Sequence, residues 1–262
     1  MTIFPFERVQ AAGEQALATW EQLKAAGRGC PVVVGDDDSV GVLMAHFSPM
    51  WPNKISIAEI LAAAATIQHP EGLKALKAQE RARAREHLRR QLEHQTASLP
   101  RVIEIDSRGR EKAPRGHAAE IRERRPRLGR WPSRAESLPA LSVALDYRGP
   151  KKKVYVALIQ TDDWTTIPAH LHYGGWNACP QPEYHVAALR SWRDRYGAEL
   201  VGLSSDRMDL RVARRPQPRS EALDLAREHY VFCNDIVDQG LGTLSKLAAC
   251  LMANDWWEFW WD

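Results

Sequence analysis

The stretch H-L-H-Y-G-G-W-N-A-C-P, residues 170–180, holds two histidines and one cysteine close together. Imidazole nitrogen and thiolate sulfur are ligands that Zn²⁺ prefers, and His185 can supply a further nitrogen. If the segment is a strand, His170 and His172 point to the same side and can bind one ion together. The alternative is two partly exposed histidines on a loop beside a sheet. We favour the loop, and we expect no metal and no cofactor.

The same stretch can instead hold a nucleophile. Cys179 lies just before a predicted helix, and the N-terminus of a helix favours a thiolate. His185 follows about one helical turn later, and His229 comes from another predicted helix. A cysteine beside a histidine base is typical of hydrolases and transferases. The alternative is that Cys179 and Cys233 are small buried side chains. The carboxylate that orients the base would come from Asp206, Asp235 or Asp238.

A third group of polar side chains lies at the ends of predicted elements, where ligand pockets often form. In D-I-V-D-Q-G, Asp235 and Asp238 are three residues apart and share one face if the segment is helical. Two close carboxylates can bind a cation or share a proton. They can also cap the next helix, which is the interpretation we favour. The predicted ligand-binding residues are Trp176, Asn177, Asp235, Asp238 and Gln239.

The C-terminal segment W-W-E-F-W-W-D is dominated by aromatic residues. In a strand, Trp257, Phe259 and Trp261 face one way, and Trp256 and Trp260 face the other. Such a strand is covered on both faces or leaves one face for a partner. We expect mainly core packing, with a partner-binding groove as the alternative.

The elements that would position these residues follow from hydrophobic periodicity. In the first half, Gly27 ends one predicted helix and Ser56 caps another. Asp36, Asp37 and Asp38 directly follow a buried strand and can hold Mg²⁺ or orient a ribose. The alternative, which we favour, is a turn that begins the next helix. The predicted elements are a helix over 6–26, a strand over 30–35, a helix after Ser56, a long charged helix from Glu71 with a leucine seam, and a strand over 101–106.

The second half has a stronger pattern. It predicts a strand over 154–159, a helix over 182–196, a hairpin turning at Ser204–Arg207, helices over 220–232 and 242–252, and a terminal strand. This order indicates an α+β fold, a mixed or antiparallel sheet covered by helices, with a helical N-terminal region. We divide the chain into an N-terminal α/β region (1–106), a basic linker rich in proline and arginine (107–149), and a C-terminal α+β domain (150–262).

Four motifs in the C-terminal half occur together in one known family. They are G-G-W-N-A-C-P, W-R-D-R-Y-G-A-E-L-V-G-L-S-S-D, A-L-D-L-A-R-E-H-Y-V-F-C-N-D-I-V-D-Q-G and W-W-E-F-W-W-D. In this order they resemble a bacterial domain of unknown function, the DUF4253 family, over roughly residues 150–262. The resemblance implies a domain but no activity, and His170 and His172 lie outside the family pattern. The family pattern includes positions that match Trp176, Asn177, Cys179, Asp206, Cys233, Asp235, Asp238 and Gln239.

Composition restricts the class of protein. Between Glu71 and Ala135 there are 18 Lys and Arg against 9 Asp and Glu, whereas the whole chain has a formal charge of +3. This basic middle can touch nucleic acid or an acidic partner, but a solvated helix and linker is the interpretation we favour. The N-terminus lacks a secretory pattern, no apolar run is long enough for a membrane helix, and the four cysteines form no CxxC pair. We therefore expect a cytoplasmic protein with reduced thiols.

Two classes of function fit these features. The leading hypothesis is a protein-binding or inhibitor-like interaction module, because the chain lacks a recognisable catalytic signature. The alternative is a hydrolase or transferase that uses Cys179 with a histidine and an aspartate. Nucleic-acid contact through the basic middle is a third hypothesis. The sequence does not predict the oligomeric state.

Overall fold

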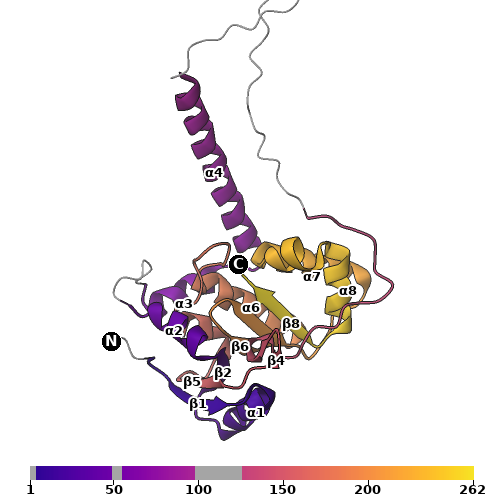
Figure 1. Ribbon diagram of the computed structural model, residues 1–262. Coiled ribbons are helices and arrows are strands. Elements are labelled where there is room, and N and C mark those ends of the chain that lie inside the picture. The colour runs from indigo at the N-terminus through magenta and orange to yellow at the C-terminus, as the bar shows by residue number, and fades with distance from the viewer. Residues whose placement is uncertain (1–3, 49–54, 98–125) are drawn as a thin grey trace, which may run out of the picture. The chain divides into compact units, whose positions relative to one another are not determined.

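The protein has a mixed main sheet covered by helices, as the sequence predicted, and the helices lie on both of its faces. The computed structural model describes residues 4–48, 55–97 and 126–262 (Figure 1). Residues 1–73 and 126–262 form one compact unit, and residues 74–125 form a second. The division of the chain at residues 106 and 149 stays a prediction.

Six strands form the main sheet of the compact unit in the order β1-β5-β2-β6-β7-β8. Only β2 and β6 run parallel; the other neighbours are antiparallel. The α+β prediction with a mixed sheet is therefore confirmed. The strands are β1 (Glu7–Ala11), β2 (Cys30–Gly35), β5 (Val154–Ile159), β6 (Glu199–Leu203), β7 (Arg207–Arg211) and β8 (Trp256–Trp260), and a separate ribbon joins β3 (Leu145–Asp146) to β4 (Gly149–Pro150).

Most helices begin and end where the sequence predicted. Ser56 caps α3 through a reciprocal capping box with Glu59, and Asp36 caps α2 by accepting from the Ser39 amide. The helices are α1 (Ala16–Ala26), α2 (Asp37–Ala45), α3 (Ile57–Thr66), α4 (Glu71–Ala97), α5 (Ile167–His170), α6 (Pro182–Tyr196), α7 (Arg219–Phe232) and α8 (Leu244–Ala253), with shorter turns η1 (Gly13–Gln15), η2 (Ser142–Ala144), η3 (Trp164–Thr166) and η4 (Ile236–Leu241).

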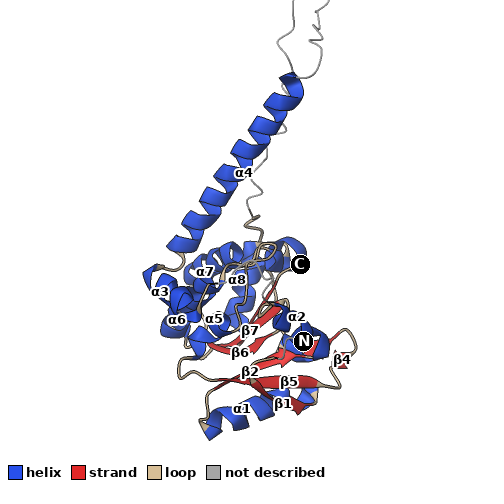
Figure 2. Ribbon diagram, turned by 90° about the vertical axis from the view of Figure 1, so that its left-hand side faces the viewer, coloured by secondary structure: helices blue, strands red, loops and turns tan. Residues whose placement is uncertain are grey.

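The two faces of the sheet have different cover (Figure 2). On one face, Trp20 of α1 and Val143 of η2 pack against Val33 and Val156. On the other face, Trp192 of α6 stacks on Phe259 of β8 with ring centroids 5.3 Å apart. The sheet is thus the middle layer of a three-layer unit, and segments from both ends of the chain build it.

The prediction of one helix over residues 6–26 is wrong for residues 6–15. Residues 7–11 form the edge strand β1, which pairs with β5, and the helix begins only at Ala16. Gly13 separates the two elements, because its amide donates to the Lys151 carbonyl at 2.8 Å. A Cβ at this glycine would lie 2.5 Å from the Ala144 carbonyl oxygen, so only glycine fits at the start of η1. The predicted end of the helix at Gly27 is confirmed, since this residue has a φ of 65°.

The aromatic C-terminal strand belongs to the core, as we expected. Trp257, Phe259 and Trp261 are 1%, 0% and 3% exposed, and Trp256 and Trp260 are half-buried on the opposite face. The alternation follows from the two-residue period of a strand at the edge of a sheet.

One buried histidine inside this cluster should make the fold sensitive to acid. His229 lies against the rings of Trp192, Trp257 and Phe259, and burial lowers its pKa from 6.5 to about 3. Between these two values the unfolded chain binds a proton that the folded protein does not, so the free energy of unfolding falls as pH decreases from about 6.5 to about 3. His229→Phe should keep the cluster and flatten this part of the curve. Urea unfolding at several pH values measures it, and parallel curves for the two proteins would contradict the assignment.

The second unit contains most of α4. Within this helix Glu86 pairs with Arg89 and Arg90 at 2.9 Å and 2.8 Å, in the spacing that stabilises an exposed helix. The helix is mostly exposed, as predicted; of its leucine seam, Leu73 is buried and Leu76 and Leu88 are half-buried. The predicted strand over 101–106 and much of the basic middle lie outside the described residues, so nucleic-acid contact stays a prediction. Among the described helices none combines the length and apolar character needed to span a bilayer.

Candidate functional site

The segment between α5 and α6 forms a tight corner with an unusual backbone. His172, Gly174, Gly175 and Asn177 have φ values of 48°, 111°, 86° and 46°. The Gly175 amide donates to the Pro180 carbonyl at 3.0 Å and closes the corner on itself. A side chain at Gly174 would put its Cβ 1.9 Å from the Pro180 carbonyl oxygen, so only glycine fits there. Left-handed conformations of residues other than glycine are costly and often occur at functional sites.

This corner brings the predicted cysteine and one predicted histidine into contact. The Cys179 Sγ lies 3.3 Å from the His185 Nε2. His185 lies in the first turns of α6, which begins at Pro182 as the sequence predicted. Cys179 is 5% exposed and His185 is 0% exposed. The pair therefore has the separation of a nucleophile and its base, but in this conformation it is closed to solvent.

Aromatic rings surround this cysteine–histidine pair. The His185 ring has its centroid 5.2 Å from that of Tyr173, 5.0 Å from Phe232 and 5.5 Å from Trp261. The outer wall is Trp176, which is half-buried and contacts Tyr173 at 4.9 Å between centroids. The surroundings of the pair are therefore apolar and suited to an apolar group.

A small surface hollow lies beside the pair. Gly174 is part of its lining, and a Cβ built on this glycine would lie 3.0 Å from the His185 Nε2. One residue of backbone thus separates the hollow from the imidazole. The lining residues are Ile55, Ile60, His172, Gly174, Gln181, Pro182 and Glu183.

The structure does not place the two histidines of the H-L-H motif on a strand. His170 ends α5, and His172 is in the left-handed region, where its ring contacts Phe47 at 5.7 Å between centroids. The strand that a shared metal site at these two histidines would require is therefore not present here. Burial lowers the pKa of both histidines. Among the residues described, no three His, Cys, Asp or Glu side chains gather as a metal ion would require.

The other predicted catalytic residues make their contacts elsewhere. His229 lies in the core cluster around Trp192, as described above. Asp206 is exposed in the turn between β6 and β7, where it accepts from Ser204 and Ser205 at 3.3 Å and 3.1 Å. Its backbone carbonyl accepts from the Trp261 amide at 3.0 Å, so the turn is joined to the end of β8.

The predicted ligand-binding residues form two separate groups. Asp235 is buried and accepts from Asn234 at 3.1 Å and from the Asp262 amide at 3.2 Å. Asp238 is exposed and accepts from Tyr230 at 3.1 Å. The capping role that we favoured for the two carboxylates is wrong, because Thr243 caps α8 by accepting from the Lys246 amide, and Asp235 makes no capping hydrogen bond at the start of η4. Gln239 is exposed near them, whereas Trp176 and the exposed Asn177 belong to the corner.

The four sequence motifs lie in the corner, in the hairpin of β6 and β7, in α7 and in the aromatic strand β8. The family model described as a domain of unknown function (DUF4253) matches residues 155–262. Residues 155–262 are a DUF4253 domain. This confirms the resemblance seen in the sequence. No curated protein and no solved structure matches the chain.

The DUF4253 match contains Cys179, His185 and the aromatic rings around them, but it does not contain the whole sheet. It begins inside β5, and β1 and β2 lie before it. Because β2 separates β5 from β6, the DUF4253 domain of this protein needs a strand from the N-terminal region to complete its sheet.

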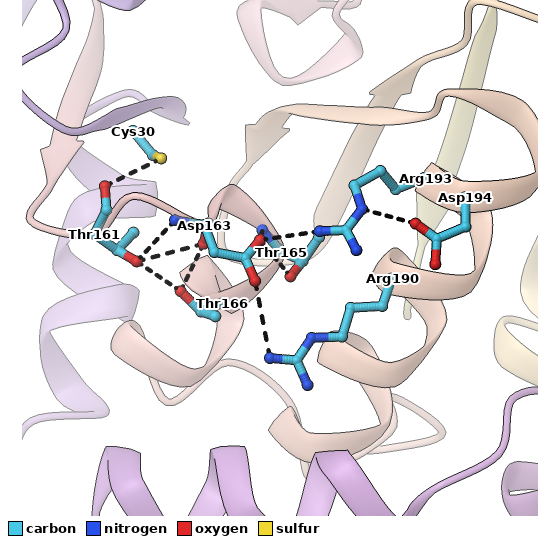
Figure 3. Close-up of polar contacts among 8 residues, drawn as sticks. All are labelled: Cys30, Thr161, Asp163, Thr165, Thr166, Arg190, Arg193 and Asp194. Carbon is cyan, nitrogen blue, oxygen red and sulfur yellow. Dashed lines mark hydrogen bonds and ion pairs between the residues drawn. The ribbon is translucent and has the colours of Figure 1, made fainter.

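A polar cluster in the DUF4253 domain was not predicted from sequence (Figure 3). Asp163 caps η3 by accepting from the Thr165 amide at 3.0 Å, and its carboxylate lies 3.4 Å from Arg193 and 3.8 Å from Arg190. Cys30 of β2 donates to the Thr161 carbonyl at 3.2 Å. The cluster joins the end of β5 to α6 and so fixes the helix that carries His185. The run T-D-D-W-T-T after a strand is the signal that could have predicted the cap.

Two buried carboxylates were also missed. Burial raises the pKa of Asp209 to about 7, and this side chain accepts from Ser142 and from the Val143 amide at 2.8 Å each, which attaches η2 to β7. Glu228 accepts from His69 at 2.9 Å and from Arg195 at 2.8 Å. Burial alone would raise the pKa of Glu228, but His69 and Arg195 outweigh it and lower the pKa to about 2.

Proposed function

We propose that the DUF4253 domain is a cysteine-dependent hydrolase or transferase, with Cys179 as the nucleophile and His185 as the general base. The observation that carries this proposal is the 3.3 Å separation between the Cys179 Sγ and the His185 Nε2. A thiol in contact with an imidazole can lose its proton to that base as it attacks. The aromatic walls favour a substrate with an apolar group next to the reacting carbon.

The reaction would proceed by acyl transfer. His185 accepts the thiol proton at Nε2, and the Cys179 sulfur attacks the carbonyl carbon of the substrate. A carbon–sulfur bond forms, the bond to the leaving group breaks with its electron pair on that group, and the proton on Nε2 passes to it. Attack by water on the thioester gives hydrolysis, and attack by another acceptor gives transfer.

Access to the cysteine would require movement of the corner. Four of the six residues from His172 to Asn177 have positive φ, and two of these four are not glycine. Such a backbone is held by its surroundings and is a candidate for a second conformation. The hollow beside Gly174 supports an approach from that side. The closed pair is then the resting form, and substrate binding opens it.

Selective alkylation tests the proposal. We expect iodoacetamide at neutral pH to modify Cys179 at least about 10-fold faster than Cys233, because the His185 imidazole contacts Cys179, whereas Cys233 donates to the Trp260 carbonyl. Cys233 is an internal control, since it is fully buried and burial raises its pKa to about 12. His185→Gln should slow the modification of Cys179, which peptide mass spectrometry measures. If Cys179 stays as inert as Cys233 until urea unfolds the protein, the cysteine proposal fails.

The second candidate is the protein-binding or inhibitor-like interaction module of our leading hypothesis, and the edge of the main sheet supports it. β8 is the last strand of the sheet, and Trp256 and Trp260 on one of its faces are only half-buried. Half-buried tryptophans beside an edge strand suit a protein partner. This candidate takes first place if the alkylation experiment finds an inert Cys179.

We also propose that the protein works in the cytoplasm. All four cysteines are free thiols, and Cys30 is only half-buried. Free thiols persist in a reducing compartment.

A further inference from the structure

Tyr173 carries a hydroxyl that the fold itself does not use. The residue is fully buried, and its Oη has no hydrogen-bond partner among the described residues. A buried hydroxyl without a partner destabilises a fold, and proteins that retain one often use it in binding or catalysis. Because phenylalanine would fill the same space without this cost, the hydroxyl calls for a functional explanation.

The position of Tyr173 relative to the cysteine–histidine pair suggests what that explanation is. The centroid of its ring lies 5.2 Å from the centroid of the His185 ring. Tyr173 is also part of the corner that ends in Cys179. Burial raises the pKa of Tyr173 well above its usual value, and negative charge on Cys179 raises it further. The hydroxyl therefore keeps its proton while the neighbouring thiol reacts, and it remains a hydrogen-bond donor.

A second donor lies beside the first. The Trp261 Nε1 is also buried without a hydrogen-bond partner in the part of the chain that the structure describes. The Trp261 ring lies 5.5 Å from the His185 ring and 6.2 Å from the Tyr173 ring, between centroids. Two rings that carry unused N–H and O–H donors thus flank the same imidazole.

We infer that the Tyr173 hydroxyl, with the Trp261 indole N–H beside it, donates to the carbonyl oxygen of an acyl substrate at Cys179. The inference rests on the proposed cysteine chemistry and adds the substrate class, an ester or thioester with a compact apolar acyl group. As the sulfur attacks, the carbonyl oxygen becomes negatively charged, and buried donors stabilise that charge strongly because no water competes with them.

Two reagents separate this role from a structural one. p-Nitrophenyl acetate transfers its acetyl group to the Cys179 sulfur: a carbon–sulfur bond forms, and p-nitrophenolate leaves with the electrons of the broken carbon–oxygen bond. This reaction passes through a charged carbonyl oxygen. Iodoacetamide reacts at its methylene carbon and expels iodide, so no charge develops on a carbonyl oxygen. An oxyanion donor should affect the first reaction and not the second.

We expect Tyr173→Phe to slow acetylation of Cys179 about 100-fold and to leave its alkylation rate unchanged, because one donor to an oxyanion is removed. Trp261→Phe, which keeps a ring but loses the N–H, should slow acetylation about 10-fold. Tyr196→Phe is the matched control: this tyrosine is equally buried, but its hydroxyl accepts from Arg195 at 3.2 Å, and acetylation should not change. Peptide mass spectrometry follows both modifications.

The outcomes distinguish the two levels of the proposal. If Cys179 is acetylated as fast in the Tyr173→Phe protein as in the wild type, the donor role is overturned and the cysteine proposal stands. If Cys179 of the wild type reacts with neither reagent, the cysteine proposal is overturned, and the donor role with it. A loss of both reactions in a folded Tyr173→Phe protein would assign Tyr173 a structural role and would also overturn the inference.

Discussion

Glu228→Ala should lower the free energy of unfolding by about 3–5 kcal/mol, because it leaves a buried ion pair without one partner. The Glu228 side chain is 5% exposed, and its carboxylate accepts from His69, from Trp192 at 2.5 Å and from Arg195. Without the carboxylate, the His69 ring and the Trp192 N–H would both be left buried beside an empty space. Glu228→Gln keeps an oxygen acceptor and should cost less.

A carboxylate on the same helix gives the matched control. Asp224 pairs with Arg227 at 2.7 Å, but the aspartate side chain is 76% exposed. Asp224→Ala should change the free energy of unfolding by less than about 1 kcal/mol, as is usual for a surface pair. Urea titration of both variants at pH 7 measures the difference. Equal losses would mean that burial of Glu228 has no special role in stability.

Gly174→Ala is the second change for which we expect a large effect, a loss of about 3–5 kcal/mol in the free energy of unfolding, because backbone strain and overlap combine. Gly174 has a φ of 111°, and a Cβ there would lie 1.9 Å from the Pro180 carbonyl oxygen. That carbonyl is backbone and accepts from the Gly175 amide, so it cannot move without opening the corner.

Gly149 allows strain and overlap to be separated. Its φ of 113° is nearly the same, but a Cβ at this position would meet nothing within 4 Å. Gly149→Ala should therefore cost only the backbone term, about 1–2 kcal/mol. Urea unfolding of the two alanine variants compares them directly, and a Gly174→Ala protein as stable as Gly149→Ala would show that the corner tolerates a side chain.

Local signals were sufficient to predict most elements. Proline at Pro182 and glycine at Gly197 mark the two ends of α6, and the structure has the helix between them. The alternation of β8 could be predicted because a strand has a fixed period of two. β1 was missed because nothing near it in the sequence specifies its pairing. Its partner is β5, and the contact at Gly13 that ends it comes from residues 144 and 151.

The contact between Cys179 and His185 was predictable from the sequence, but the residues that surround this pair were not. Cys179 and His185 are six residues apart across a helix start, so their contact follows from local geometry. Their burial depends on Phe232 and Trp261, which arrive much later in the chain. Glu228 looked like an ordinary charged residue of a helix, because its partner His69 is 159 positions away. Tyr173 gave no signal at all, since a hydroxyl without a partner is visible only in three dimensions.

The place of β2 between β5 and β6 has a practical consequence for anyone who expresses this protein. A recombinant fragment cut at the family boundary, residue 155, would lack a central strand and would leave two interior edges open to aggregation. Conversely, polypeptides comprising residues 1–97 and 126–262 each contain strands that the other lacks. Produced together from two genes, they should reassemble into one sheet, which would make the protein a natural starting point for a two-part complementation reporter.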